Sequence, residues 1–172
     1  MTPEDKDAIM SLVNYPGRVA GPEDRQAVLA HFGTADGVSL GLDLLERAAS
    51  KRDIDDLELA LIVCFAFGVT NAHLSVLLEL SQEDWHRSHE DIVSKLGELT
   101  SPDSVTALRE LAEWVPAYLE YDESRALARK AIWAIGGIPG PEAEGALIQL
   151  AGSDDEIVRK EAKRQLDRRS ST

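Results

Sequence analysis

The chain has 172 residues, of which 44% are apolar and 28% are charged, the balance of a globular protein with its own core. Its longest apolar stretch, residues 57–69, is interrupted by Glu58 and falls short of the roughly 18–20 residues of a membrane span. The polar, acidic start predicts no secretory or transit peptide. A single cysteine, Cys64, excludes an intramolecular disulfide framework and a cysteine-rich zinc site, and we expect a cytoplasmic protein.

The net charge is −13, from 31 acidic and 18 basic residues. Such a charge repels nucleic-acid phosphates and anionic lipid surfaces, and it favours a basic partner. The charge is also uneven, because residues 1–124 hold 24 acidic and 9 basic residues, whereas residues 125–172 hold 7 acidic and 9 basic ones. We therefore expect the negative field to come from the first two-thirds of the chain. Solubility alone is the competing interpretation.

A large apolar residue followed by glycine recurs at the end of apolar segments. The recurring positions, the last of which has aspartate in place of glycine, are Gly33, Gly68, Gly97, Gly136 and Asp167. They are 35, 29, 39 and 31 residues apart, which indicates a loose internal repeat. Because glycine adopts the left-handed conformation that closes many helices, each glycine is expected to end a helix and each repeat to end near these points.

The segments between these points also have apolar residues at helical spacing, and none alternates with a period of two. These segments are residues 38–49, 74–80, 105–119 and 143–150. Pro116 should kink or shorten the third one, while Ser101 and Asp155 are expected to cap helices. The pattern predicts helix pairs, an incomplete one followed by about four more, that stack into a single domain over residues 1–172.

Residues 127–138 resemble the second helix of a HEAT repeat, in particular the bacterial HEAT-like type also found in phycobilin lyases. Asp155, Val158, Arg159 and Ala162 match that family's Asp-x-x-Val-Arg-x-x-Ala core. The resemblance is specific over residues 122–169. It is weaker over residues 36–99, where the apolar pattern persists without the Asp and Arg.

The resemblance implies an all-α fold, a HEAT-like right-handed α-solenoid of about four to five helix pairs whose second helices line the concave face. It also implies that Asp155 and Arg159 brace neighbouring repeats. Trp133 lies where the family commonly has tryptophan, so we expect it in the core. Most members of the family are binding scaffolds, an analogy of fold that does not by itself assign a function.

Charge and resemblance together predict a non-catalytic scaffold that binds a basic protein through an acidic concave face. The expected partner-binding residues are Asp55, Asp56, Glu58, Glu90, Asp91, Trp114, Tyr118 and Tyr121. The three aromatic residues would form one stripe if the helix continued past Pro116, and core packing is the competing interpretation for them. An immunity or antitoxin protein against a basic toxin fits this size and charge. The oligomeric state is left open.

No cofactor or metal is expected. A weak metal candidate is formed by His86, His89 and Glu90. If this segment were helical, Glu83, His86 and Glu90 would share a face, with His89 beside them. A solvated polar helix face is the favoured interpretation of this segment. The di-iron deoxyhypusine hydroxylases, a HEAT-like enzyme class, use paired His-Glu motifs on successive repeats. This chain has a single His-Glu motif, so we do not expect that activity. Cys64 lies among apolar residues, which predicts an inert buried thiol.

Two alternatives remain open from the sequence. One is a HEAT-like enzyme, either lyase-like or metal-dependent, centred on residues 83–91. The other is a solenoid that binds nucleic acid through its basic C-terminal helix, as in the HEAT-like alkylpurine DNA glycosylases. The acidic charge of residues 1–124 disfavours the second, because those glycosylases need a basic groove.

Overall fold

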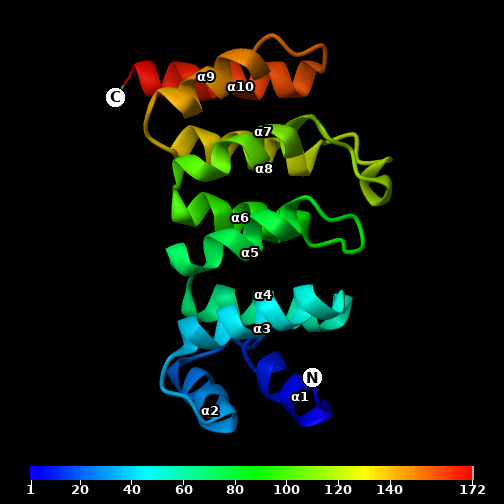
Figure 1. Cartoon of the computed structure of the whole chain (residues 1–172), viewed down its shortest axis with the longest axis vertical. Coiled ribbons are helices and arrows are strands. Elements are labelled where there is room, and N and C mark those ends of the chain that lie inside the picture. The colour runs from blue at the N-terminus through cyan, green and yellow to red at the C-terminus, as the bar shows by residue number, and fades with distance from the viewer. Residues whose placement is uncertain (172) are drawn as a thin grey trace. The chain divides into compact units, whose positions relative to one another are not determined.

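The computed structural model describes residues 1–171, and within that range it consists of ten α-helices and three short 3₁₀ helices without a β-strand (Figure 1). One isolated bridge joins Tyr15 and Arg18. The all-α prediction is therefore confirmed. The chain forms two compact units, unit 1 (Met1–Val76) and unit 2 (Leu77–Thr172). The prediction of a single domain stays a prediction, and the two units are described separately.

Unit 1 begins with two short helices and continues with a closely packed helix pair. Its helices are α1 (Pro3–Met10), α2 (Pro22–Phe32), α3 (Gly37–Lys51), α4 (Ile54–Phe67) and η1 (Asn71–His73). The α3–α4 pair is close because Gly41 faces Cys64, and a Cβ atom at Gly41 would lie 3.0 Å from the Cys64 sulfur. Cys64 is fully buried, which confirms the prediction of a buried thiol.

Unit 2 contains the remaining helix pairs, the first of which starts at the boundary between the units. Its helices are α5 (Leu74–Ser81), α6 (His89–Leu99), η2 (Pro102–Ser104), α7 (Val105–Glu113), η3 (Ala117–Leu119), α8 (Ala126–Gly137), α9 (Pro141–Leu150) and α10 (Glu156–Ser170). Helix α8 packs against α6, α7 and α10, and α10 also packs against α9.

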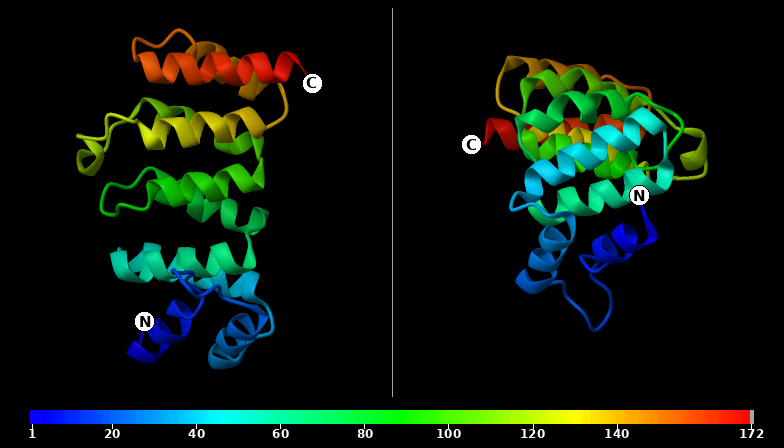
Figure 2. Two further views of the ribbon diagram at one scale, coloured as in Figure 1. Left: turned by 180° about the vertical axis from the view of Figure 1, so that it is seen from behind. Right: turned by 60° about the horizontal axis from the view of Figure 1, so that its bottom comes forward.

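The helices of unit 2 form two layers. Helices α7 and α9 lie in front in Figure 1, whereas α6, α8 and α10 face the viewer in the reverse view of Figure 2. We call α5, α7 and α9 the first helices of unit 2 and α6, α8 and α10 its second helices. Helix α8 packs between α6 and α10 and also against α7 and α9, so the apolar faces of these helices form one continuous core, as in an α-solenoid. None of the helices within residues 1–171 has the length and apolar character of a membrane span.

Local signals in the sequence explain where the helices of unit 2 begin and end. Asp155 caps α10 by accepting hydrogen bonds from the amides of Ile157 and Val158, and the Ser101 hydroxyl accepts one from Asp103. Helix α7 ends at Glu113, ahead of Pro116. These three predictions are confirmed.

The glycines of the recurring signature have two different roles. Gly33 follows α2 in the left-handed conformation, with φ of +65°, as predicted. Gly97 and Gly136 lie inside α6 and α8, so the prediction that they end helices is wrong. A Cβ atom at Gly97 would lie 3.2 Å from the Ala134 Cβ, and one at Gly136 would overlap the Gln165 side chain. These two glycines therefore allow α6, α8 and α10 to approach one another closely.

Candidate functional site

The acidic residues predicted on α4 have different environments in unit 1. Asp55 and Glu58 are exposed, and Asp55 forms a long ion pair of 3.5 Å with Lys6. Asp56 is buried, and its carboxylate lies 2.8 Å from the α-ammonium group of Met1. Asp56 therefore stabilises the packing within unit 1, and its role in partner binding stays a prediction.

The second helices of unit 2 are more cationic than expected. Asp91 is exposed, but the Glu90 carboxylate pairs with Lys130 Nζ at 3.0 Å. Together α6, α8 and α10 carry six carboxylates and nine cations. The carboxylates are Glu90, Asp91, Glu98, Glu156, Glu161 and Asp167, and the cations are Lys95, Arg129, Lys130, Arg159, Lys160, Lys163, Arg164, Arg168 and Arg169. The anionic character predicted for the second helices does not extend over unit 2.

The first helices of unit 2 have the opposite charge. They carry five glutamates and one arginine. All five glutamates are exposed, and they are Glu79, Glu110, Glu113, Glu142 and Glu144. The arginine, Arg109, pairs with Glu113 at 3.1 Å. The two sets of helices in unit 2 thus present charges of opposite sign.

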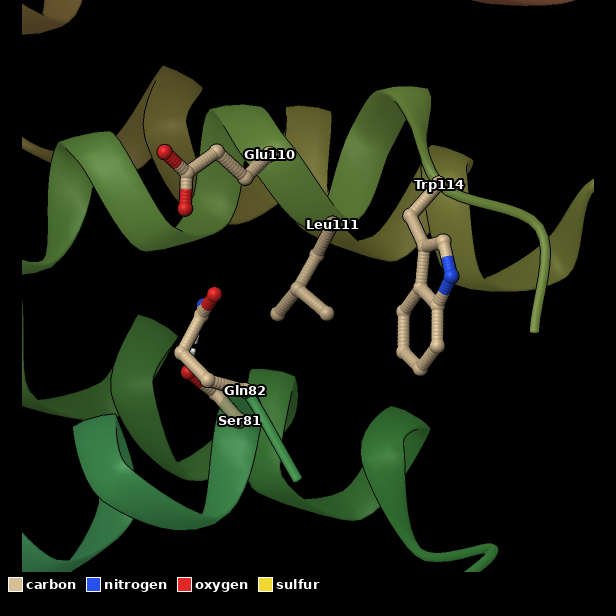
Figure 3. Close-up of a pocket in the computed structure, with 5 residues that line it drawn as sticks. All are labelled: Ser81, Gln82, Glu110, Leu111 and Trp114. Atoms are coloured by element: carbon tan, nitrogen blue, oxygen red, sulfur yellow. Dashed lines mark hydrogen bonds between the residues drawn. The ribbon is translucent and has the colours of Figure 1, made fainter. Parts of the chain in front are cut away.

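A pocket of about 290 Å³ lies on the anionic side, between the end of α5 and α7 (Figure 3). Leu111, only 2% exposed, forms its apolar floor. In Figure 3 the Glu110 carboxylate and the Gln82 amide face each other on one side of Leu111, and the Trp114 ring stands on the other side. The pocket therefore offers an aromatic wall and oxygen acceptors across an apolar floor.

Two contacts hold Trp114 in its position. Its ring and the His89 ring are nearly perpendicular, with centroids 4.9 Å apart. Its backbone carbonyl accepts a hydrogen bond of 3.3 Å from Arg125, whose Nε donates to Asp155 Oδ2 at 2.8 Å. Trp114 is thus fixed from the side of α6 and from the start of α8.

The predicted aromatic stripe does not form, because α7 ends before it. Tyr118 lies in η3 and its hydroxyl is 2.9 Å from His89 Nδ1, whereas Tyr121 is 90% exposed. The condition for a shared stripe of Trp114, Tyr118 and Tyr121, a helix that continues past Pro116, is therefore not met. Trp114 alone contributes to the pocket.

The two histidines of the metal candidate are packed inside unit 2. Residues 82–88 form an irregular segment rather than a helix, and both histidines are buried with their rings stacked 4.4 Å apart. His86 Nε2 lies 2.9 Å from the Leu80 carbonyl, and its Nδ1 accepts from the Ser88 amide. His89 Nε2 lies 2.8 Å from the Glu83 carbonyl.

All four ring nitrogens therefore have hydrogen-bond partners, and Glu90 is paired with Lys130. The expectation of a solvated helix face is wrong. Burial lowers the pKa of both imidazoles, and for His89, beside His86, the pKa falls to about 4. Among residues 1–171, no three His, Cys, Asp or Glu side chains are grouped as metal ligands.

Trp133 is an exposed aromatic residue on a second helix of unit 2. It was expected in the core, but it is 45% exposed in a groove of about 470 Å³ between α6 and α8. The guanidinium carbons of Arg168 and Arg164 lie 4.6 and 5.8 Å from the centre of its ring. The sequence contains one signal for this contact: Arg164 and Arg168 are one turn apart on α10, so both side chains lie on the same face of that helix. Because its ring is already covered by cations, Trp133 is a poor acceptor for a basic partner.

The structure also tests the brace that the resemblance implied. Asp155 joins the last helix pair to Arg125 at the start of α8. Arg159 instead donates to the carbonyls of Ser153 and Asp154, within its own pair. The bracing role is therefore confirmed for Asp155 but not for Arg159.

Comparison with known proteins gives one match. Residues 112–172 match the family model of HEAT repeats, which spans the end of α7 and helices α8, α9 and α10. The narrower phycobilin-lyase type stays a prediction. The searches of curated proteins and of solved structures found no match. HEAT repeats are commonly protein-interaction scaffolds and are typically non-catalytic.

Proposed function

We propose that the protein is a non-catalytic scaffold that binds a basic protein partner, because residues 112–172 match the family model of HEAT repeats. The observation that carries the proposal is the separation of charge in unit 2, with glutamates on its first helices and most cations on its second helices. A basic partner is attracted to the first helices and repelled by the second ones. The charge separation therefore selects both the partner and the face that it binds.

This proposal moves the binding face of unit 2 from the second helices to the first. Asp55 and Glu58 on α4 of unit 1, and Asp91 on α6, are exposed carboxylates, and their role in partner binding stays a prediction. The net charge of −13 adds long-range attraction and fast association. An immunity or antitoxin protein that neutralises a basic toxin is one scaffold of this kind, supported by size and charge.

Binding of nucleic acid through α10 has less support, because several cations of this helix are engaged within the protein. Arg169 donates to the carbonyls of Ile138 and Gly140, and Arg164 and Arg168 lie over Trp133. Releasing these groups for phosphates would cost the contacts that they make. The acidic first helices would also repel the same phosphates.

The proposal is tested by affinity capture from the native host with three forms of the protein. The first is the wild type, and the second is the triple variant Glu110→Gln, Glu142→Gln, Glu144→Gln on the first helices. The third is a matched control in unit 1, Asp7→Asn, Glu23→Gln, Glu46→Gln, which removes the same number of exposed charges. Captured proteins are identified by mass spectrometry, and their affinities are measured by calorimetry at several salt concentrations.

We expect the wild type to capture a protein of high isoelectric point. The first-helix variant should bind it at least about tenfold more weakly and with a flatter salt dependence, because attractive ion pairs are lost. The control should bind within about twofold of the wild type. Capture of only neutral or acidic proteins, or an equal loss in both variants, contradicts the proposal.

A further inference from the structure

We infer that the pocket between α5 and α7 is the anchor site for an arginine side chain of the basic partner. The inference rests on the proposed function and adds the residue type that is recognised and the place where it binds. It depends on the acceptors at one side of the pocket, the aromatic wall at the other, and an arrangement of the same groups elsewhere in unit 2.

The Glu110 carboxylate has capacity for a cation. Its side chain is 50% exposed, and Arg109 Nη2 lies 4.0 Å away from it. Arg109 makes its closer contact, 3.1 Å, with Glu113. The Gln82 Nε2 group donates to the Ser81 hydroxyl, which leaves the Gln82 carbonyl oxygen as an acceptor beside Glu110. A guanidinium group carries five N–H donors in one plane and can reach both acceptors.

The other side of the pocket suits the rest of an arginine side chain. Leu111 and the Trp114 ring form an apolar surface for the methylene groups, and the ring face attracts a cation. Trp114 is held by His89 and Arg125, so little side-chain entropy is lost when a ligand binds. Arginine is favoured over lysine because its planar group stacks on an aromatic ring and binds a carboxylate through two N–H groups.

The second helices of unit 2 already contain an arginine that contacts both a tryptophan ring and a glutamine carbonyl oxygen. Arg168 lies 4.6 Å from the centre of the Trp133 ring and donates to the Gln165 carbonyl oxygen at 3.1 Å. The pocket offers the same two groups in Trp114 and Gln82, with the carboxylate of Glu110 in addition. Within residues 1–171, no guanidinium group stacks on Trp114. The arginine that completes the pocket is therefore supplied by the partner.

The test uses the full chain and four blocked tripeptides of the form acetyl-Gly-X-Gly-amide, in which X is arginine, citrulline, lysine or glutamate. Citrulline keeps the shape of arginine without its charge. Binding is followed by two-dimensional ¹⁵N–¹H NMR at the indole N–H of Trp114 and the side-chain amide of Gln82. Trp114→Phe assigns the indole signal while keeping an aromatic ring against His89. Glu110→Gln is the test variant, and Glu144→Gln on α9 is the control with the same loss of charge.

We expect the arginine peptide to shift both signals with a dissociation constant in the range of about 1–10 mM, as for one isolated side chain. Citrulline and lysine should bind at least about threefold more weakly, and glutamate should leave both signals unmoved. Glu110→Gln should weaken the arginine peptide by about fivefold or more, whereas Glu144→Gln should leave it within about twofold of the wild type.

Equal binding of citrulline, or equal weakening by Glu110→Gln and Glu144→Gln, overturns the pocket as an anchor site. Equal binding of lysine overturns the choice of arginine. Neither result decides the scaffold proposal, which is tested by the capture experiment with the whole partner. Conversely, capture of acidic proteins together with specific binding of the arginine peptide overturns the scaffold proposal and keeps the pocket.

Discussion

Arg125 and Asp155 join the last two helix pairs through a hydrogen bond of 2.8 Å from Arg125 Nε to Asp155 Oδ2. The same guanidinium group donates to the carbonyls of Ala112 and Trp114 at the end of α7. The other Asp155 oxygen caps α10 through the amides of Ile157 and Val158. One charged pair thus connects α7, α8 and α10 and supports the backbone of the Trp114 pocket.

The substitution Asp155→Ala should lower the free energy of unfolding by about 2 kcal/mol, of which about 1 kcal/mol is the lost helix cap. Burial raises the pKa of Asp155, but the amides of Val158 and Ile157 and the Arg125 guanidinium outweigh that effect and lower it. The stabilisation is therefore present at neutral pH and is lost as the pH falls below about 4. Denaturant unfolding at pH 7 measures the loss.

Asp154→Ala is the control for this prediction. Asp154 is the exposed neighbour of Asp155, and the hydrogen bond that it receives from Arg159 ends on its backbone carbonyl. Its removal should change the free energy of unfolding by no more than about 0.5 kcal/mol. Similar losses for the two variants would show that the cap and the Arg125 pair contribute nothing specific.

The features that the sequence predicted correctly are local ones. The caps at Ser101 and Asp155 and the early end of α7 ahead of Pro116 each depend on residues within one turn of the helix terminus. Their physical causes are present in any short window of sequence. The pairing of helices was also predictable, because an amphipathic helix needs a neighbour to bury its apolar face.

The burial of polar residues could not be predicted, because it depends on partners far away in the chain. Asp56 is buried by the Met1 ammonium 55 residues away, and His89 reaches Tyr118 across 29 residues. The family position of Trp133 predicted core packing, but its ring is 45% exposed. The opposite charges of the first and second helices are present in the sequence, but they separate only when charges are summed over single helices and not over residues 1–124.

The buried histidines make the stability of the protein dependent on pH. The pKa of His89 is lowered to about 4, mainly by burial and then by His86, and the pKa of His86 is also lowered by burial. Between about pH 6.5 and pH 4 the unfolded chain binds protons that the folded chain does not. The free energy of unfolding should therefore fall as the pH falls, with a slope of up to about 1.4 kcal/mol per pH unit for each histidine.

Denaturant unfolding at pH 7, 6 and 5 checks this prediction. His89→Gln should lower the stability at pH 7 but flatten its dependence on pH, because one of the titrating groups is gone. His73 in unit 1, whose pKa is lowered by burial, contributes a slope of the same sign. The decisive quantity is therefore the difference in slope between the variant and the wild type, and parallel curves would disprove the role of His89.

The glycines within the helices of unit 2 should respond to substitution in opposite directions. Gly97→Leu should lower the free energy of unfolding by about 2 kcal/mol, because the new side chain would meet Ala134 on α8. A Cβ atom at Gly145 on α9 meets no atom within 4 Å, so Gly145→Ala should raise the stability by about 0.5–1 kcal/mol through helix propensity alone. Thermal unfolding of both variants measures the effects, and a stabilised Gly97→Leu would exclude close packing of α6 on α8.

The exposure of Trp133 determines how much stability its removal should cost. Trp133 is 45% exposed and its neighbour Ile132 is fully buried, so Trp133→Ala should cost about 1–2 kcal/mol, against about 3–4 kcal/mol for Ile132→Ala. Part of the Trp133 cost is the loss of cation–π contacts with Arg168 and Arg164. Arg168→Gln measures that part: it should cost about 0.5–1 kcal/mol in the wild type and less in the Trp133→Ala background, where Arg168 still donates its hydrogen bond to Gln165. A cost for Trp133→Ala equal to that for Ile132→Ala would place the indole in the core, and additive losses for Arg168 and Trp133 would mean that their contact contributes no stability.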